Sequence, residues 1–293
     1  MVKWQGRRGS DNVDDRRGAV GAAGMSGLAM VVVRLVMTRF GVGGLAVLAV
    51  GFFALRSIGV DPLALAGGGG QGTAELSAVD RQAGEFSSVI LAETETVWGD
   101  RFAASNSRYP APGLVLFSDR NVSACGQALA AMGPFYCPAD KKIYIDTTFY
   151  AELSKRFGAP GDFAAAYVIA HEVGHHIQTI TGISRQVQQA KAGASQVQQN
   201  QLQVRMELQA DCYAGIWAHD ADRVAGILED GDIEEGLRAA SAIGDDALQR
   251  QAGRQVKQET FTHGSSAQRS HWFTVGYRQG DVSACDTFSV DQL

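Results

Sequence analysis

The feature that most constrains this chain is an apolar helical stretch at residues 162–180, which carries the sequence His-Glu-Val-Gly-His at 171–175. The residues before this motif, 163–170, read Phe-Ala-Ala-Ala-Tyr-Val-Ile-Ala, a composition typical of a helix that is buried on most sides. Burying imidazoles and a carboxylate without partners costs several kcal/mol. We therefore expect these polar side chains to have a function.

The spacing of the motif fits a metal site. His171 and His175 are four residues apart, so both imidazoles lie on one face of a helix and can bind one ion. Glu172 is offset by one residue and can reach a water molecule beside the ligands. A catalytic zinc site uses three protein ligands and keeps one position open, so the third ligand must come from another part of the chain.

Glu207 and Asp211 form a second pair with the same spacing, on a stretch whose other residues are largely apolar. A solvated acidic face is the alternative interpretation, but such a stretch has little solvated surface. Glu207 could be the third ligand, and Asp211 could accept a hydrogen bond from the ring N–H of a ligating histidine. We therefore expect one Zn²⁺ per chain, bound by His171, His175 and Glu207.

The composition limits the class of partner. The chain has 293 residues, of which 45% are apolar and 19% charged, and its formal net charge is −5. These values are ordinary for a folded protein. No long basic cluster occurs outside the N-terminal region, so nothing indicates a nucleic-acid partner.

An apolar stretch of 21 residues, Phe40–Val60, is long enough to span a bilayer. Positive charges before it favour a cytoplasmic N-terminus. We expect a cytoplasmic segment at 1–39, a transmembrane signal anchor at 40–60, a glycine-rich linker at 61–73 and an extracytoplasmic domain at 74–293. A cleaved signal peptide and a buried soluble helix are the alternatives for the apolar stretch.

Within 74–293 the pattern predicts a small sheet followed by helices, which is an α+β, mainly helical fold. Residues 75–103 show helical spacing, and strands are expected at Gly113–Ser118, Phe135–Cys137 and Lys142–Asp146. The expected long helices are Asp162–Ile180, roughly Gln186–Ala218 with an interruption at Gly193, and Asp232–Ala242. The glutamines at 186–203 are interpreted as a solvated helix face.

The four cysteines include no Cys-x-x-Cys pair, so a cysteine-based zinc site is not expected. An even number in an exported domain favours two disulfides. Cys125 and Cys137 could close a local loop, which would leave Cys212 and Cys285. The sequence does not choose among the three connectivities, and four free thiols in a reducing compartment are the alternative.

Three segments in order resemble a bacterial family described as putative neutral zinc metallopeptidases: HEVGHH at 171–176, ELQADCYAG at 207–215 and FTHGSSAQR at 261–269. The opening KWQGRRGSDNVDDRRG (3–18) and the ending GYRQGDVSACDTF (276–288) resemble it too. The broader resemblance is to gluzincins, including membrane-linked zinc peptidases, and it implies a zincin-like fold.

In the gluzincin pattern the third ligand is a Glu followed four residues later by an Asp, as at Glu207 and Asp211. The resemblance also implies a Thr-His-Pro segment with a later Arg, which Thr262, His263 and Arg269 match except that Gly264 replaces the Pro. His263 would donate a hydrogen bond to the oxyanion, with His271 as an alternative donor. Arg269 could orient this segment or bind substrate carboxylate or carbonyl groups.

The expected function is that of a hydrolase, a zinc metalloendopeptidase that uses a metal-activated water with Glu172 as general base. Its substrate would be a peptide or an unfolded protein, bound beside an edge strand at Phe135–Cys137 or Lys142–Asp146. Two alternatives stay open: a membrane-tethered, zinc-stabilised scaffold or chaperone without turnover, and a non-peptidase zinc hydrolase.

Overall fold

The computed structural model describes residues 1–18, 35–36, 38–39, 76–159 and 161–293. The chain forms two compact units, one made of Met1–Arg16 and Ser77–Leu293 and the other of Arg17–Leu76. The expected anchor (40–60) and linker (61–73) lie outside the described residues. In the part of the chain that is described, no helix is both long and apolar enough to cross a bilayer.

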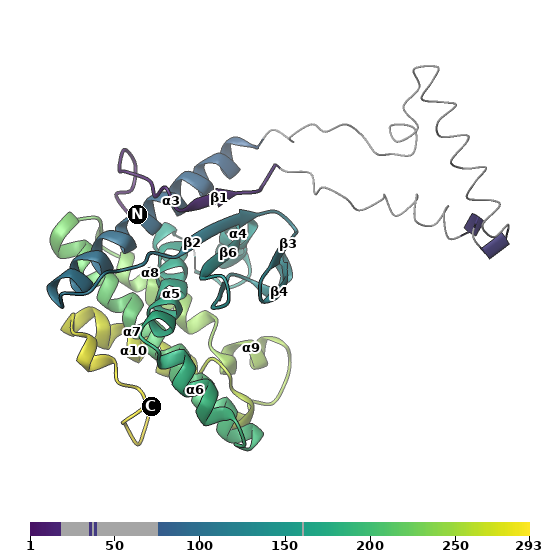
Figure 1. The fold of residues 1–293 in the computed structure, drawn as a ribbon, viewed down its shortest axis with the longest axis vertical. Coiled ribbons are helices and arrows are strands. Elements are labelled where there is room, and N and C mark those ends of the chain that lie inside the picture. The colour runs from purple at the N-terminus through teal and green to yellow at the C-terminus, as the bar shows by residue number, and fades with distance from the viewer. Residues whose placement is uncertain (19–34, 37, 40–75, 160) are drawn as a thin grey trace. The chain divides into compact units, whose positions relative to one another are not determined.

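A four-stranded sheet forms one side of the larger unit, with the strand order β1-β2-β6-β5 (Figure 1). The strands are β1 (Val13–Asp15), β2 (Gly113–Phe117), β5 (Phe135–Cys137) and β6 (Lys142–Asp146). β1, β2 and β6 are parallel, whereas β5 runs antiparallel to β6 and forms an edge. The three strands predicted from the sequence are therefore confirmed within a residue.

The N-terminal residues differ from the expected boundaries. Val2 and Trp4 are buried in the main core, and β1 pairs with β2 in the sheet. Met1–Arg16 therefore belongs to the unit that we expected to begin at residue 74. Hydrogen-bonded strands must lie on the same side of any membrane, so a single crossing between β1 and β2 does not fit this pairing. The extracytoplasmic location of the unit stays a prediction.

The two faces of the sheet bury different side chains because successive residues of a strand point to opposite faces. Leu114, Leu116, Ile143 and Ile145 belong to the large core that the helices form. Val115, Phe117 and Tyr144 belong to a smaller cluster with Ala128 and Cys137. Burial on both faces explains why β2 is a continuous apolar run.

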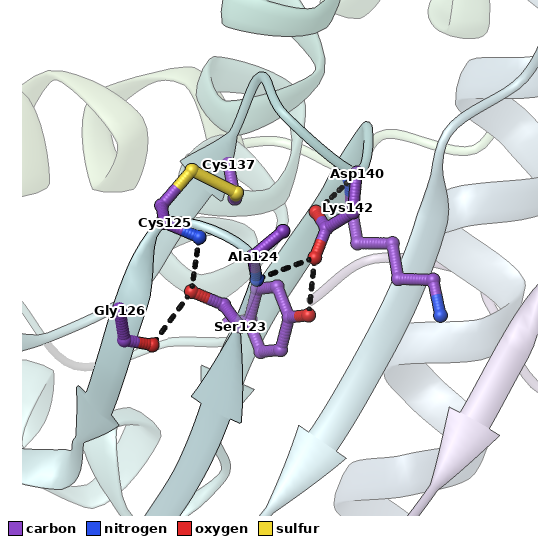
Figure 2. The surroundings of a disulfide bond; sticks show 8 residues. Ser123, Ala124, Cys125, Gly126, Cys137, Asp140 and Lys142 are labelled. Atoms are coloured by element: carbon purple, nitrogen blue, oxygen red, sulfur yellow. Dashed lines mark hydrogen bonds between the residues drawn. A yellow bond between two sulfur atoms is a disulfide. The ribbon is translucent and has the colours of Figure 1, made fainter.

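A hairpin of β3 (Arg120–Ser123) and β4 (Gly126–Leu129) contributes Ala128 to the smaller cluster. The Cys125–Cys137 disulfide joins its turn to β5 (Figure 2). Asp140 adds a second connection, because its carboxylate accepts hydrogen bonds from the backbone N–H of Ala124 and the Tyr144 hydroxyl. The sequence pattern did not predict this hairpin.

The predicted helices are present, although the second long stretch extends past Ala218 to Ala225, and no bounds were predicted for the helices at Thr148–Lys155, Asp245–Gln251 and Ser266–Gln279. Their bounds are α3 (Ala78–Ala104), α4 (Thr148–Lys155), α5 (Asp162–Ile180), α6 (Ile183–Lys191), α7 (Gln196–Ala225), α8 (Asp232–Ala242), α9 (Asp245–Gln251) and α10 (Ser266–Gln279). α5 and α8 have the bounds predicted from the sequence. The interruption expected at Gly193 separates α6 from α7. This residue has a φ of 85°, a backbone conformation that glycine adopts more readily than other residues. The architecture is mixed α and β, and mainly helical, as expected.

Close helix packing places α5, α7 and α10 against one another. A Cβ at Gly174 of α5 would lie 2.9 Å from the Ala210 backbone of α7. A Cβ at Gly276 of α10 would lie 1.9 Å from the carbonyl oxygen of Cys212 in α7. The Cys212–Cys285 disulfide then joins α7 to the segment after α10. Both disulfides follow the pairing that the local loop suggested.

Replacing Gly276 by alanine tests this packing. The added methyl group has no space against the α7 backbone, so we expect Gly276→Ala to lower the free energy of unfolding by about 1–3 kcal/mol. Gly99 of α3 is the matched control, because a Cβ there would meet no atom within 4 Å. Gly99→Ala should raise the free energy of unfolding by about 0.5–1 kcal/mol. Denaturant titration measures both, and equal effects would contradict the packing argument.

Candidate metal centre

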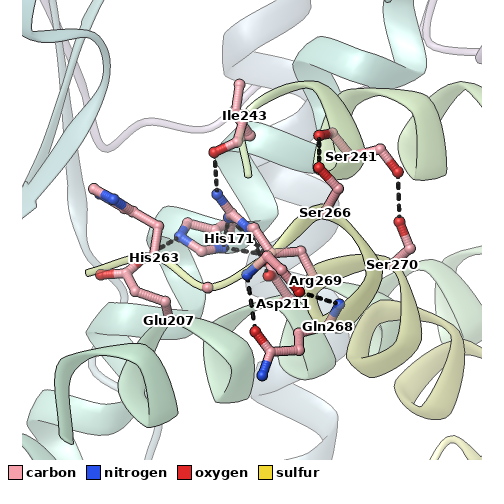
Figure 3. Close-up of polar contacts among 12 residues, drawn as sticks. His171, Glu207, Asp211, Ser241, Ile243, His263, Ser266, Gln268, Arg269 and Ser270 are labelled. Carbon is pink, nitrogen blue, oxygen red and sulfur yellow. Dashed lines mark hydrogen bonds and ion pairs between the residues drawn. The ribbon is translucent and has the colours of Figure 1, made fainter. Parts of the chain in front are cut away.

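Three side chains converge between α5 and α7. The nearest oxygen of Glu207, Oε2, lies 3.2 Å from His171 Nε2 and 3.4 Å from His175 Nε2. One potential ligand atom from each of the three residues lies within 4.8 Å of the others. The three residues predicted as ligands therefore form one cluster, and Figure 3 shows His171 and Glu207 meeting there.

The Asp211 carboxylate holds one side of this cluster. Its Oδ1 lies 2.7 Å from His171 Nδ1 and accepts a hydrogen bond of 2.5 Å from the Tyr167 hydroxyl. Arg269 donates from Nε to Oδ2 and from Nη2 to Oδ1, both at 2.9 Å. Asp211 thus fixes the His171 ring with Nδ1 as a donor, so Nε2, which faces Glu207, is the nitrogen that would bind a metal once its proton is displaced.

The other two candidate ligands have neutral partners. Gln178 Oε1 lies 2.9 Å from His175 Nδ1, and Gln178 Nε2 donates to Gln209 Oε1. Gln203 Nε2 donates to Glu207 Oε1 at 2.7 Å, which leaves Oε2 directed at the two imidazoles. Each candidate ligand is therefore oriented by one separate residue.

Sequence reasoning missed Gln178 and Gln203. The stretch at 186–203 was interpreted as a solvated face, and for Gln203 this interpretation was wrong. The available signal was helical spacing, since Gln203 is four residues before Glu207 and Gln178 is three residues after His175.

The donor set fits zinc. Two imidazole nitrogens and one carboxylate oxygen are a ligand set of catalytic zinc sites, in which a fourth position faces a cavity. His171, His175 and Glu207 line a cleft of about 470 Å³. The three candidate ligands would bind the ion from the protein side, and the cleft leaves the fourth position accessible.

Glu172 lies where the sequence predicted a general base. It lines the same cleft and is 7% exposed. Among the residues that the structure describes, no hydrogen-bond donor is paired with its carboxylate. A nearly buried carboxylate that faces the cleft without a protein partner is available to accept a proton from a substrate or water molecule.

His263 and Arg269 also line the cleft but differ in surroundings. The His263 side chain is 51% exposed, and its Nδ1 lies 3.3 Å from Asp245 Oδ1. The Asp245 carboxylate also accepts the backbone N–H groups of Thr262, His263 and Gly264 and so organises this loop. Arg269 is 2% exposed and its guanidinium is occupied by Asp211, which favours an orienting role over substrate contact.

His271 is exposed on α10 and does not line the cleft, so the geometry favours His263 as the oxyanion donor of the two. His176 is fully buried and connects α5 to other elements. Its Nε2 lies 2.6 Å from the Pro110 carbonyl oxygen, and its Nδ1 lies 3.1 Å from the hydroxyl of Tyr136 in β5. Burial lowers the pKa of His176 to about 4, so the ring is neutral and donates to Pro110. This histidine positions the edge strand rather than binding the metal.

The carboxylates change the protonation of the imidazoles. Burial opposes a charge on His171, but Asp211 and Glu207 outweigh it and raise the pKa of His171 to about 10. Burial likewise opposes, and Glu207 raises, the pKa of His175. Without a metal the cluster therefore holds protons, which a cation must displace.

The fold and the site define a class: an α+β protein whose candidate metal centre combines H-E-x-x-H on one helix with a glutamate from another. A family model described as "Putative neutral zinc metallopeptidase" matches residues 2–288. The chain therefore belongs to this zinc metallopeptidase family.

Two relatives show how far the similarity extends. The chain is 47% identical over 291 residues to the uncharacterized protein YpfJ of Escherichia coli (strain K12), covering 98% of this chain and 99% of that protein. It is 47% identical over 195 residues to the uncharacterized protein Mb2605 of Mycobacterium bovis, covering 63% of this chain and 65% of that protein. No solved structure matches the chain.

Zinc binding should depend on pH with a definite sign. Zinc binds deprotonated imidazole nitrogens, and the metal-free cluster holds protons up to the raised pKa values. Zinc affinity should therefore rise as pH increases toward the His171 pKa of about 10 and fall as pH decreases. At pH 7, calorimetry in buffers of different ionisation enthalpy should show release of about one proton per zinc from His171, and a further contribution from His175, whose pKa is also raised. Binding without proton release would contradict the proposed cluster.

Asp211→Asn tests the orienting role of this carboxylate. An amide cannot neutralise Arg269 and does not fix the His171 tautomer. We expect zinc affinity to fall about 10- to 100-fold, and stability to fall by about 3–5 kcal/mol because a buried charge is left unpaired. Tyr167→Phe removes one hydrogen bond to the same carboxylate and should cost about 1 kcal/mol. Zinc titration and denaturant unfolding measure the two effects, and an unchanged affinity in Asp211→Asn would refute the role.

Proposed function

We propose that this chain is a zinc-dependent metalloendopeptidase. The observation that carries the proposal is the meeting of His171, His175 and Glu207 in a cleft that Glu172 also faces. Zinc bound there would lower the pKa of a coordinated water toward about 7 and polarise a carbonyl group. This combination is suited to hydrolysis of an amide bond.

The protein residues supply the remaining chemistry. Glu172 accepts the proton of the attacking water and then transfers it to the leaving amine. His263 donates a hydrogen bond to the oxyanion, and the loss of one such donor costs roughly 3–4 kcal/mol of barrier. Gln203, Gln178 and Asp211 hold the ligands in position.

Strand β5 fits the binding of an extended peptide. It is one edge of the sheet, and Phe135 and Tyr136 line the cleft. An edge strand offers unpaired backbone groups that a peptide can join as a further strand. The contact between Tyr136 and His176 holds this edge beside α5. The proposed substrate is therefore an extended segment of a peptide or an unfolded protein.

Two disulfides favour an oxidising compartment for this unit. An extracytoplasmic location agrees with them and stays a proposal, as does membrane association through residues 40–60. Fractionation of cells that express the full chain tests membrane association. Alkylation of free thiols before lysis tests the compartment, because all four cysteines should escape alkylation in an oxidising one.

Glu172→Gln tests the mechanism. The amide keeps the size of the side chain but cannot accept the proton, so cleavage of an unfolded protein should fall about 10²- to 10⁴-fold. Zinc content should stay at one ion per chain, because Glu172 is not a ligand. Glu85→Gln, on the exposed face of α3, is the matched control and should cleave like the wild type.

The outcomes separate the alternatives. Full cleavage by Glu172→Gln would remove the mechanism. A wild-type chain that binds zinc and unfolded protein but cleaves no peptide bond would indicate a scaffold or chaperone without turnover.

A further inference from the structure

Lys191 is the last residue of α6 and lies in the wall of the cleft. It is partly buried, and its ammonium donates a hydrogen bond to Gln203 Oε1. Across the described ranges, no carboxylate lies within ion-pair distance of its Nζ. A partly desolvated ammonium with only a neutral partner retains most of its attraction for an anion.

The other cationic side chains of the cleft are already paired. Arg269 is bound by Asp211, and His263 lies beside Asp245. Among the described residues, Lys191 is connected to an anion only through Gln203, whose amide nitrogen donates a hydrogen bond to the Glu207 carboxylate. A divalent ion would neutralise the charges of Glu207 and Glu172. Lys191 is then the side chain left with an unbalanced positive charge.

The distance suits recognition of a substrate group. Two hydrogen bonds and one amide group separate Lys191 Nζ from Glu207 Oε1, a path of at most about 8 Å because each hydrogen bond spans roughly 3 Å. An extended peptide advances about 3.3–3.6 Å per residue. The ammonium therefore lies within about two residues of a bound peptide from Glu207.

Other residues of the cleft lining offer no competing cation. Met132, Pro134, Phe149 and Leu248 are apolar. A substrate carboxylate placed there would lose its hydration without gaining a partner. Burial lowers the pKa of Lys191, and Glu207 opposes this effect, so an added anion would hold the ammonium in its charged form.

We propose that Lys191 binds a carboxylate of the peptide substrate and so determines which peptides this cleft accepts. The carboxylate comes from an Asp or Glu side chain or from the C-terminus of the peptide. This inference rests on the proposed function for its substrate class, but binding is measurable without turnover.

The test uses the zinc-loaded full chain carrying Glu172→Gln, so that bound peptides stay intact. Four labelled peptides are compared by fluorescence anisotropy. Two share a sequence without charged side chains, one with an amidated and one with a free C-terminus. The other two are amidated variants of that sequence with one Glu, placed at a different position in each. At least one of the three carboxylate-bearing peptides should bind about 10- to 100-fold more tightly than the neutral amide. The free C-terminus and the internal Glu distinguish the two sources.

Lys191→Met, added to this chain, should remove that preference and leave the affinity of the neutral amide within about two-fold. Lys191→Arg should keep the preference, because it keeps the charge. Lys257→Met removes an exposed lysine that does not line the cleft and is the charge-matched control. Zinc content must be the same in all variants, since a purely structural role of Lys191 would alter Glu207 through Gln203.

Each result decides the inference. Equal binding of all four peptides, equal loss for every peptide in Lys191→Met, or no binding of any peptide would overturn it. Carboxylate-dependent binding that Lys191→Met removes would establish it, even if the wild-type chain cleaves nothing, in which case only the proposed peptidase activity fails. In a cleaving wild type the same substitution should raise KM for carboxylate peptides and leave kcat unchanged.

Discussion

The Asp211 carboxylate is fully buried and joins three helices that are distant in the sequence. From α7 it contacts His171 and Tyr167 of α5 and Arg269 of α10. A buried carboxylate is tolerated only where donors surround it, and Arg269 supplies the compensating charge. Burial alone would raise the pKa of Asp211, but Arg269 and His171 outweigh it and lower this pKa to about 2. The carboxylate therefore stays charged, and the orientation of His171 depends on this charge.

Much of the centre was accessible from the sequence because its spacing is helical. His171 and His175, and likewise Glu207 and Asp211, are four residues apart within apolar stretches, and this pattern identifies both the helix and the face. The bounds of α5 were predicted for the same reason. What joins the two helices is not encoded locally: the close approach requires Gly174 opposite Ala210, and one glycine in a helix does not reveal its partner.

The parts that sequence reasoning missed depend on contacts between distant segments. Three residues of β1 are too few for a strand signal, and the sequence pattern therefore assigns them to an N-terminal segment separate from the domain, because their partner β2 is distant in the sequence. Gln203 looked like part of a solvated face, yet its amide is used by Glu207 on one side and Lys191 on the other. For Arg269, the resemblance left open whether the side chain orients a segment or binds substrate, and the hydrogen bonds to Asp211 favour an orienting role.

The C-terminal segment supports the candidate metal ligands although it contributes none. Gln209 Nε2 donates to the carbonyl oxygen of Cys285, and Gln209 Oε1 accepts from Gln178, which contacts His175. The Cys212–Cys285 disulfide holds that carbonyl at a fixed distance from α7. Because hydrogen-bonded side chains in a dry interior have few alternative partners, a displacement of this segment would reach the His175 ring through two glutamines. The disulfide thus restrains the orientation of His175, and Arg269, through Asp211, restrains that of His171.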